Sequence, residues 1–86
     1  MTEAVPPAEQ HLRTAFGEAV QRRRLQMQPK LSQVDLAYKV GVHPQTITFI
    51  EGGKRGSSDK VKLAIADALG VELRDLLPDG QEAKAS

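Results

Sequence analysis

The feature that most constrains this chain is a series of short helical segments separated by glycine and proline. Between these breaks, apolar residues recur at three- and four-residue spacing, as they do on one face of an α-helix. The sequence lacks the alternating β-branched runs between hairpin turns that indicate strands. The chain has 86 residues, so we expect a single, small all-α domain.

Helix-start and helix-stop signals predict five helices. Ser32 is a suitable N-cap, Pro44 suits a first helical turn, and Gly41 suits a left-handed helix end. The expected helices cover residues 12–27, 32–40, 43–51, 58–69 (starting at Ser57 or Ser58) and 72–77. In the second helix, the apolar pattern is Val34, Ala37, Tyr38 and Val40.

The two ends of the chain differ from its middle. "MTEAVPPAEQ" has two prolines and little to bury, and "PDGQEAKAS" has a similar composition. We expect a flexible arm over 1–10, a domain over 11–77 and a flexible tail over 78–86. The two ends carry four carboxylates against one lysine and sum to −3, so 11–77 carries +4 of the total of +1. Such a mildly basic body is compatible with a polyanionic partner.

Several function classes lack their usual sequence features. Cysteine is absent, so there is no disulfide, thiolate metal site or cysteine nucleophile. No apolar run approaches the roughly 20 residues of a membrane span, and the start of the chain does not resemble a signal peptide. His11 and His43 form no cluster with carboxylates, and "EGGKRG" lacks the strand and spacing of a P-loop. We expect no metal, no cofactor, no membrane association and no enzyme activity.

Two short helices joined by a glycine turn, the second opening with proline, are typical of a helix-turn-helix. "LSQVDLAYKVGVHPQTITFIEGGKR…ALGVELRDLL" resembles the lambda-repressor/Cro-like (XRE) family of DNA-binding domains over about residues 12–77. "IEGGKR" is similar to the family's "IE-N-G-K-R", and "ALGVELRDLL" to its "ALGVSLDELL". The resemblance implies a compact five-helix lambda-repressor-like domain with disordered tails.

The resemblance also implies a function. It is that of a sequence-specific transcriptional regulator of repressor type, which binds a palindromic double-stranded DNA operator as a homodimer. The implied location is the cytoplasm, with the nucleoid, in a prokaryotic or phage setting. A regulatory protein partner is compatible with the size of the chain. The alternative is a protein-interaction module of the same fold, such as an antitoxin, with weak or no DNA binding.

Helix 43–51 presents one side away from its apolar positions. At about 100° per residue from Ile47, Gln45 lies near 160° and Phe49 near 200°, and two threonines flank them. In the family this outer face enters the major groove, where Gln can pair with adenine and Thr can contact thymine or phosphate. For the threonines, ordinary helix-surface filling is an equal alternative. The expected base contacts are His43, Gln45, Thr46, Thr48 and Phe49.

Phe49 departs from the polar or basic residue common in the family at this position. We consider three alternatives: contact with a thymine methyl, a core position if the helical phase is off by one residue, or an anchor for a protein partner. Helix 43–51 also carries no Lys or Arg, so it cannot read guanine through arginine. We therefore expect its contacts to favour A·T pairs.

Positive charge must come from around this helix, while Arg22 and Arg23 are more simply explained as a solvated face. Gln33 lies beside the open amides of the second helix, which can bind phosphate. The expected phosphate contacts are Gln33, Lys54, Arg55, Ser57, Ser58 and Lys60.

The resemblance further implies an ion pair between Arg24 and Glu51. A dimer surface is expected at Leu73, Leu76 and Leu77, unless these leucines only complete the core.

Overall fold

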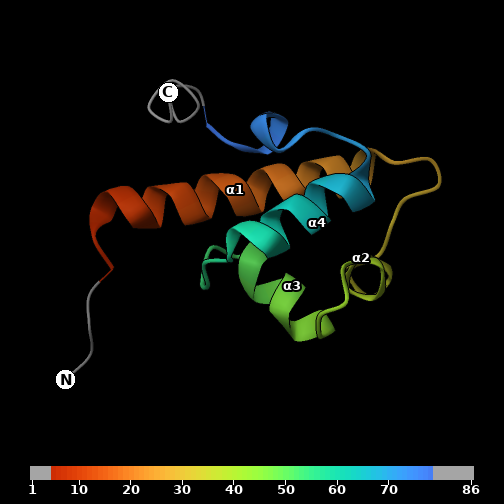
Figure 1. The fold of residues 1–86 in the computed structure, drawn as a ribbon, viewed down its shortest axis with the longest axis horizontal. Helices are drawn as coiled ribbons and strands as arrows, with labels where there is room; N and C mark the ends of the chain where they lie inside the picture. The colour runs from red at the N-terminus through yellow and green to blue at the C-terminus, as the bar shows by residue number, and fades with distance from the viewer. Residues whose placement is uncertain (1–4, 79–86) are drawn as a thin grey trace.

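The computed structural model describes residues 5–78, and Figure 1 shows its elements in chain order. Within those residues there are helices and no strands, so the prediction of an all-α fold is confirmed. The long helix α1 has α3 on one side and the last short helix on the other. The elements are α1 (Pro7–Gln26), α2 (Gln33–Val40), α3 (Pro44–Glu51), α4 (Asp59–Leu69) and the 3-10 helix η1 (Leu73–Leu76).

The ends of α2 and α4 are set by local capping. Ser32 and Ser58 each accept a hydrogen bond through Oγ from the backbone N–H three residues later, at 3.0 and 3.2 Å. Gly41 and Gly70 end the two helices with φ of 89° and 72°, a left-handed conformation that costs glycine no Cβ clash. The boundaries expected for the second, third and fourth helices are therefore close to those observed. The expected fifth helix is a four-residue 3-10 helix.

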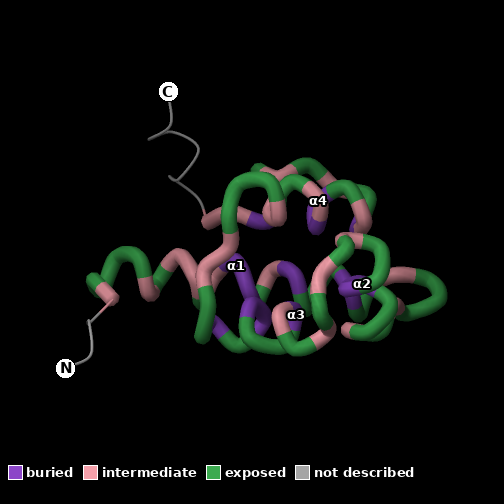
Figure 2. Tube along the Cα trace, turned by 60° about the horizontal axis from the view of Figure 1, so that its bottom comes forward, coloured by how far each residue is buried: buried purple, intermediate pink, exposed green. Residues whose placement is uncertain are grey.

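The core lies where α1, α2, α3 and α4 face one another, and Figure 2 shows the buried stretches gathered there. Ile47 and Ile50 of α3 are buried in it, as the helical phase predicts. The apolar pattern expected for α2 was partly wrong, because Val34 and Tyr38 are 60% and 87% exposed. Leu36, next to Ala37, takes the buried position instead. With i and i+4 on one helix face, Val34 and Tyr38 share a stripe that no described element covers.

Helix α1 begins earlier than expected, at Pro7 instead of Leu12, so residues 7–10 are helical and not part of an arm. Pro7 lacks an N–H that a first turn would leave unpaired anyway. The added turn is also held by a distant contact, since Gln10 donates to the Gly53 carbonyl at 2.8 Å. Residues 1–4 and 79–86, where the remaining tails were expected, lie outside the described residues.

The leucines of η1 contribute mainly to the core of the monomer. Leu76 is 1% exposed, so the expectation that it forms a dimer surface is wrong. Leu73 and Leu77 are half-buried and pack against the core cluster. Because 3-10 side chains three residues apart eclipse, Leu73 and Leu76 point to the same side, toward α1 and α4. Of the three leucines, only Leu73 and Leu77 retain surface for a second subunit.

Candidate nucleic-acid interface

The position of α3 is fixed by a buried ion pair with α1. Arg24 donates from Nε to Glu51 Oε2 at 2.7 Å and from Nη2 to Glu51 Oε1 at 3.0 Å. The two side chains are only 9% and 3% exposed. Arg24 also donates from Nη1 to the Leu31 carbonyl at 2.9 Å. This two-point geometry joins the end of α3 to α1 and to the segment that enters α2.

Gln33 extends this pair into a polar network. Its Nε2 donates to Glu51 Oε1 at 2.8 Å, and its Oε1 accepts from the Thr48 hydroxyl at 3.0 Å. Thr48 also reaches the Pro44 carbonyl at 3.3 Å. The Gln33 amide therefore holds α2 against α3 and leaves only one N–H for a phosphate. Sequence reasoning placed Gln33 and Thr48 as separate DNA contacts and missed that they bind each other.

The outer side of α3 is partly exposed. Gln45 is exposed, and Phe49 is 37% exposed and outside the core cluster. The alternative in which Phe49 is a core residue is therefore wrong. His43 is the N-cap, and its Nδ1 accepts from the Gln45 N–H at 3.0 Å, which leaves Nε2 as the ring donor. An amide, a phenyl ring and an imidazole are thus presented together at this face.

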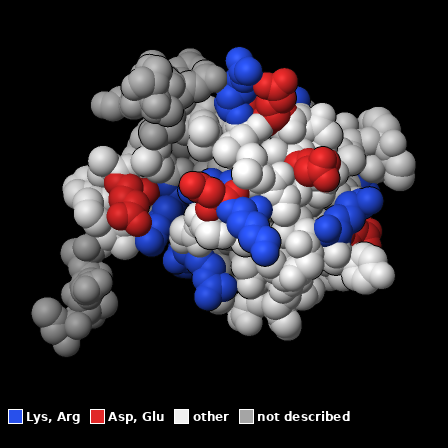
Figure 3. All heavy atoms as spheres, in the orientation of Figure 1, with Lys and Arg blue, Asp and Glu red and all other residues white. Residues whose placement is uncertain are grey.

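Basic residues surround α3 instead of lying on it. Lys54 and Arg55 are exposed in the loop after α3, and Lys60 is exposed in the first turn of α4. Ser58 caps α4 by accepting from the Val61 N–H through its hydroxyl oxygen, which leaves its O–H able to donate to a phosphate, while Ser57 is half-buried. Arg22 and Arg23 line a hollow with Asp75 and Leu77, away from α3. Figure 3 shows basic and acidic side chains interspersed over the face that it presents.

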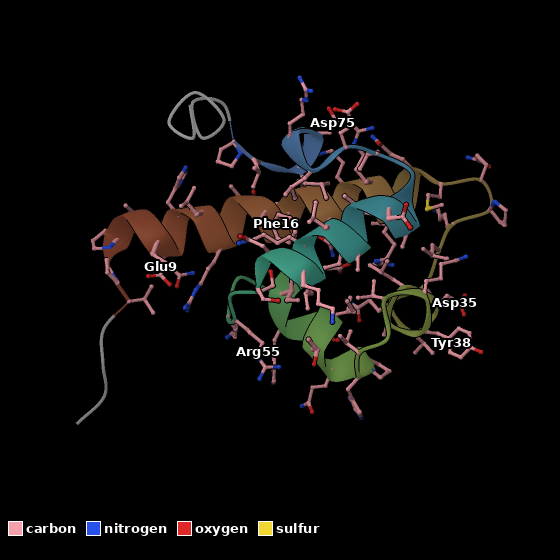
Figure 4. All side chains as sticks on the ribbon, in the orientation of Figure 1. Glu9, Phe16, Asp35, Tyr38, Arg55 and Asp75 are labelled. Carbon is pink, nitrogen blue, oxygen red and sulfur yellow. The ribbon has the colours of Figure 1, made fainter. Side chains whose placement is uncertain are left out.

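Arg55 has a more specific position than Lys54. Its Nη1 donates to the Thr46 hydroxyl at 3.3 Å, across nine residues of chain. Figure 4 shows the Arg55 side chain extending from the loop back along α3. No other side-chain hydrogen bond or ion pair holds Arg55 or Lys54 within the described part of the chain. No motif in the sequence indicates this contact, because it depends on the path of the Gly52–Gly53 turn.

Gly17 is a further determinant of the site that sequence reasoning missed. It lies in the middle of α1, on the buried side that it shares with Phe16, Val20 and Arg24, and a Cβ there would meet the Ile50 and Glu51 carbonyl oxygens at 2.2 and 2.8 Å. Glycine thus lets α1 approach the backbone of α3 directly. An isolated glycine inside a helical pattern, which costs about 1 kcal/mol relative to alanine, was the available signal.

Metal and membrane sites are not indicated by the described residues. Residues 5–78 contain no group of three or more His, Asp or Glu side chains placed to hold an ion. No helix within this range has the length and apolar character needed to cross a bilayer.

Comparison with known proteins identifies the family. The model of the helix-turn-helix family matches residues 20–76. The chain belongs to this family, and the predicted membership of its XRE type is confirmed. An uncharacterized HTH-type transcriptional regulator of Methanocaldococcus jannaschii is 48% identical over 46 residues, which are 54% of this chain and 70% of the relative. The chain is thus of the class of DNA-binding transcriptional regulators.

Solved structures that contain this fold come from more than one kind of protein. The restriction-modification controller protein C.AhdI from Aeromonas hydrophila is 31% identical, with a TM-score of 0.70, over 76% of this chain and 96% of that one. The hydroxypropylphosphonic acid epoxidase from S. wedmorenis is also 31% identical, with a TM-score of 0.69. The match covers 78% of this chain and 35% of the epoxidase chain, so this likeness concerns one part of the enzyme.

Proposed function

We propose that this protein is a sequence-specific repressor that binds a palindromic operator as a homodimer and inserts α3 into the major groove. One observation carries the proposal: Gln45 and Phe49 stand outward on a helix whose opposite side is buried and held by the Arg24–Glu51 pair. A helix held this firmly can present side chains to base edges in a fixed register. One recognition helix per subunit would place half-sites about 10 bp apart.

In this proposal the outer face of α3 reads bases and the surrounding residues contact the backbone. Gln45 pairs with the N6 and N7 edge of adenine, and Thr46 offers a methyl or hydroxyl group beside it. Lys54 and Lys60, with Ser57 and the remaining amide N–H of Gln33, contact phosphates. The surface of Leu73 and Leu77 that stays exposed in the monomer forms part of the dimer contact.

The test of this assignment is the salt dependence of DNA binding. Phosphate contacts release counterions, so log K should fall linearly with log salt, with a slope of about −0.9 per phosphate neutralised. Lys54→Gln and Lys60→Gln should each make the slope less negative by about 0.9, as measured by fluorescence anisotropy with a labelled duplex. Lys30→Gln, at an exposed lysine in the loop after α1, is the matched control and should leave the slope unchanged. Binding that is weak and independent of salt for every duplex would contradict the proposal.

Phe49→Ala is expected to relax base preference at one position of each half-site. The substitution removes the phenyl group and with it the apolar contact to a thymine methyl. We expect this loss to cost about 1 kcal/mol, or roughly fivefold in discrimination between T and the other bases. Because Phe49 is 37% exposed and outside the core cluster, the free energy of unfolding measured in urea should fall by about 1 kcal/mol or less, well below the roughly 3–5 kcal/mol that truncation of a core phenylalanine costs. The measurement is competition binding against duplexes with T replaced by U, which lacks the methyl, at each position.

The second candidate function, a protein-interaction module, rests on Phe49 as an exposed aromatic on a helix without Lys or Arg. The two candidates differ in what Phe49→Ala and Gln45→Ala remove. Loss of DNA discrimination in both variants favours the repressor. DNA binding that is unchanged in both, together with loss of a protein partner in Phe49→Ala, favours the module.

A further inference from the structure

Helix α3 lacks a cation, yet one cation lies directly beside the part of it that reads bases. Thr46 is in the first turn of α3, and it accepts a 3.3 Å hydrogen bond from Arg55 Nη1. In helix-turn-helix proteins, the N-terminal residues of the recognition helix are those that contact base edges. The guanidinium of Arg55 is therefore placed at the base-reading end of α3, although its Cα belongs to the following loop.

We propose that Arg55 is a specificity-determining residue that reads a guanine next to the A·T pairs contacted by α3. This assignment rests on the proposed function and replaces the expectation that Arg55 contacts phosphate. The expectation that the contacts of α3 itself favour A·T pairs is kept. The chemistry fits because arginine donates two parallel N–H bonds to guanine O6 and N7. A guanidinium carries five N–H donors, so it can keep its bond to Thr46 while making both.

Thr46 acts in this proposal as a positioning residue. An arginine side chain has high rotamer freedom, and a base contact gains from holding it in place before binding. The Thr46 hydroxyl supplies an acceptor for this purpose from the reading helix itself. Lys54, one residue earlier, has no such partner among the described side chains. Its position fits a phosphate contact without base preference.

The experiment exploits the difference between arginine and lysine. A phosphate contact tolerates Arg55→Lys because the charge is kept, whereas a bidentate guanine contact does not. Bound duplexes are selected from a random pool with the parent, Arg55→Lys, Thr46→Val and the control Lys30→Arg, each checked for its helical circular dichroism spectrum. Binding of the selected duplex is then measured over a range of salt concentrations.

The expected result has three parts. The parent selects one G·C pair in each half-site, and Arg55→Lys loses about 5- to 150-fold of the preference for it with the salt slope unchanged. Thr46→Val, which removes the acceptor at similar volume, weakens the same preference to a smaller extent. Lys30→Arg, at the exposed lysine in the loop after α1, keeps the parent's motif.

Two results would overturn the assignment while leaving the proposed function intact. One is a parent motif made of A·T pairs alone, and the other is a G·C preference that survives in Arg55→Lys. Failure of the parent to enrich any motif would instead overturn the proposed function, and the role of Arg55 with it.

Discussion

Glu51→Ala is expected to destabilise the protein by about 3–5 kcal/mol and leave much of it unfolded at 25 °C. The change removes both acceptors of Arg24 Nε and Nη2 and leaves a guanidinium that is 9% exposed without a counterion. It also removes the acceptor of the Gln33 amide. Domains are typically stable by only about 5–15 kcal/mol, and small ones lie at the low end. Urea unfolding followed by circular dichroism measures the loss.

The control for this prediction is the exposed ion pair of α1. Arg13 and Glu9 form a bridge of 3.0 Å at an i,i+4 spacing, with side chains 24% and 53% exposed. Pairs of this kind contribute about 0–1 kcal/mol, so Glu9→Ala should change stability little. If Glu51→Ala and Glu9→Ala cost the same, the buried pair does not hold α3 as the structure indicates.

A paired replacement separates the charge from the packing. Arg24→Met with Glu51→Leu removes both charges, so the loss should be well below the sum of the single losses, because neither charge is left buried alone. The remaining cost comes from the Leu31 carbonyl and the Gln33 amide, which lose their partners. A double-mutant cycle in urea gives the coupling directly. Losses that simply add would contradict a direct interaction between the two side chains.

Gly17→Ala is expected to destabilise the protein by about 3 kcal/mol, although alanine is the better helix former by about 1 kcal/mol. The new methyl group would overlap the Ile50 carbonyl oxygen, which is backbone and cannot rotate away. Relief of this overlap requires α3 to move away from α1, so DNA discrimination should fall even in the folded fraction. Thermal unfolding and competition binding on the same preparation measure both effects.

Gly52→Ala is the matched control. Gly52 follows α3 with φ of −85°, and its added Cβ would meet nothing closer than the Thr48 carbonyl oxygen at 3.4 Å. Its effect on stability should stay within about 0.5 kcal/mol. If Gly17→Ala is as stable as the parent, the close approach of α1 and α3 is not a constraint on the fold.

The fold was largely predictable because its signals are local. Ser32, Gly41 and Pro44 set helix ends through their own backbone and capping chemistry, and the phase of α3 follows from Ile47 and Ile50. The errors came from tertiary contacts. The first turn of α1 depends on the bond from Gln10 to Gly53, which lies 43 residues away, and the choice of Leu36 over Tyr38 depends on where α3 and α4 pack.

The sequence allowed several residues of the candidate site to be predicted, but not the hydrogen bonds between them. The ion pair expected between Arg24 and Glu51 is present, and Gln45 and Phe49 face outward. The bonds that join Gln33 to Thr48 and Arg55 to Thr46 depend on how α2 and the loop after α3 pass α3 in space. Periodicity within one helix carries no information on such distances. The structure is therefore needed to assign a role to each of these residues.

Selection of bound duplexes from a random pool, at two salt concentrations, tests the central claim most directly. We expect one enriched motif with two inverted half-sites about 10 bp apart, the same at both concentrations and recovered less efficiently at the higher one. An enriched motif without inverted symmetry would contradict the dimer. A pool that stays random at both concentrations, with a folded protein, would contradict sequence-specific DNA binding itself.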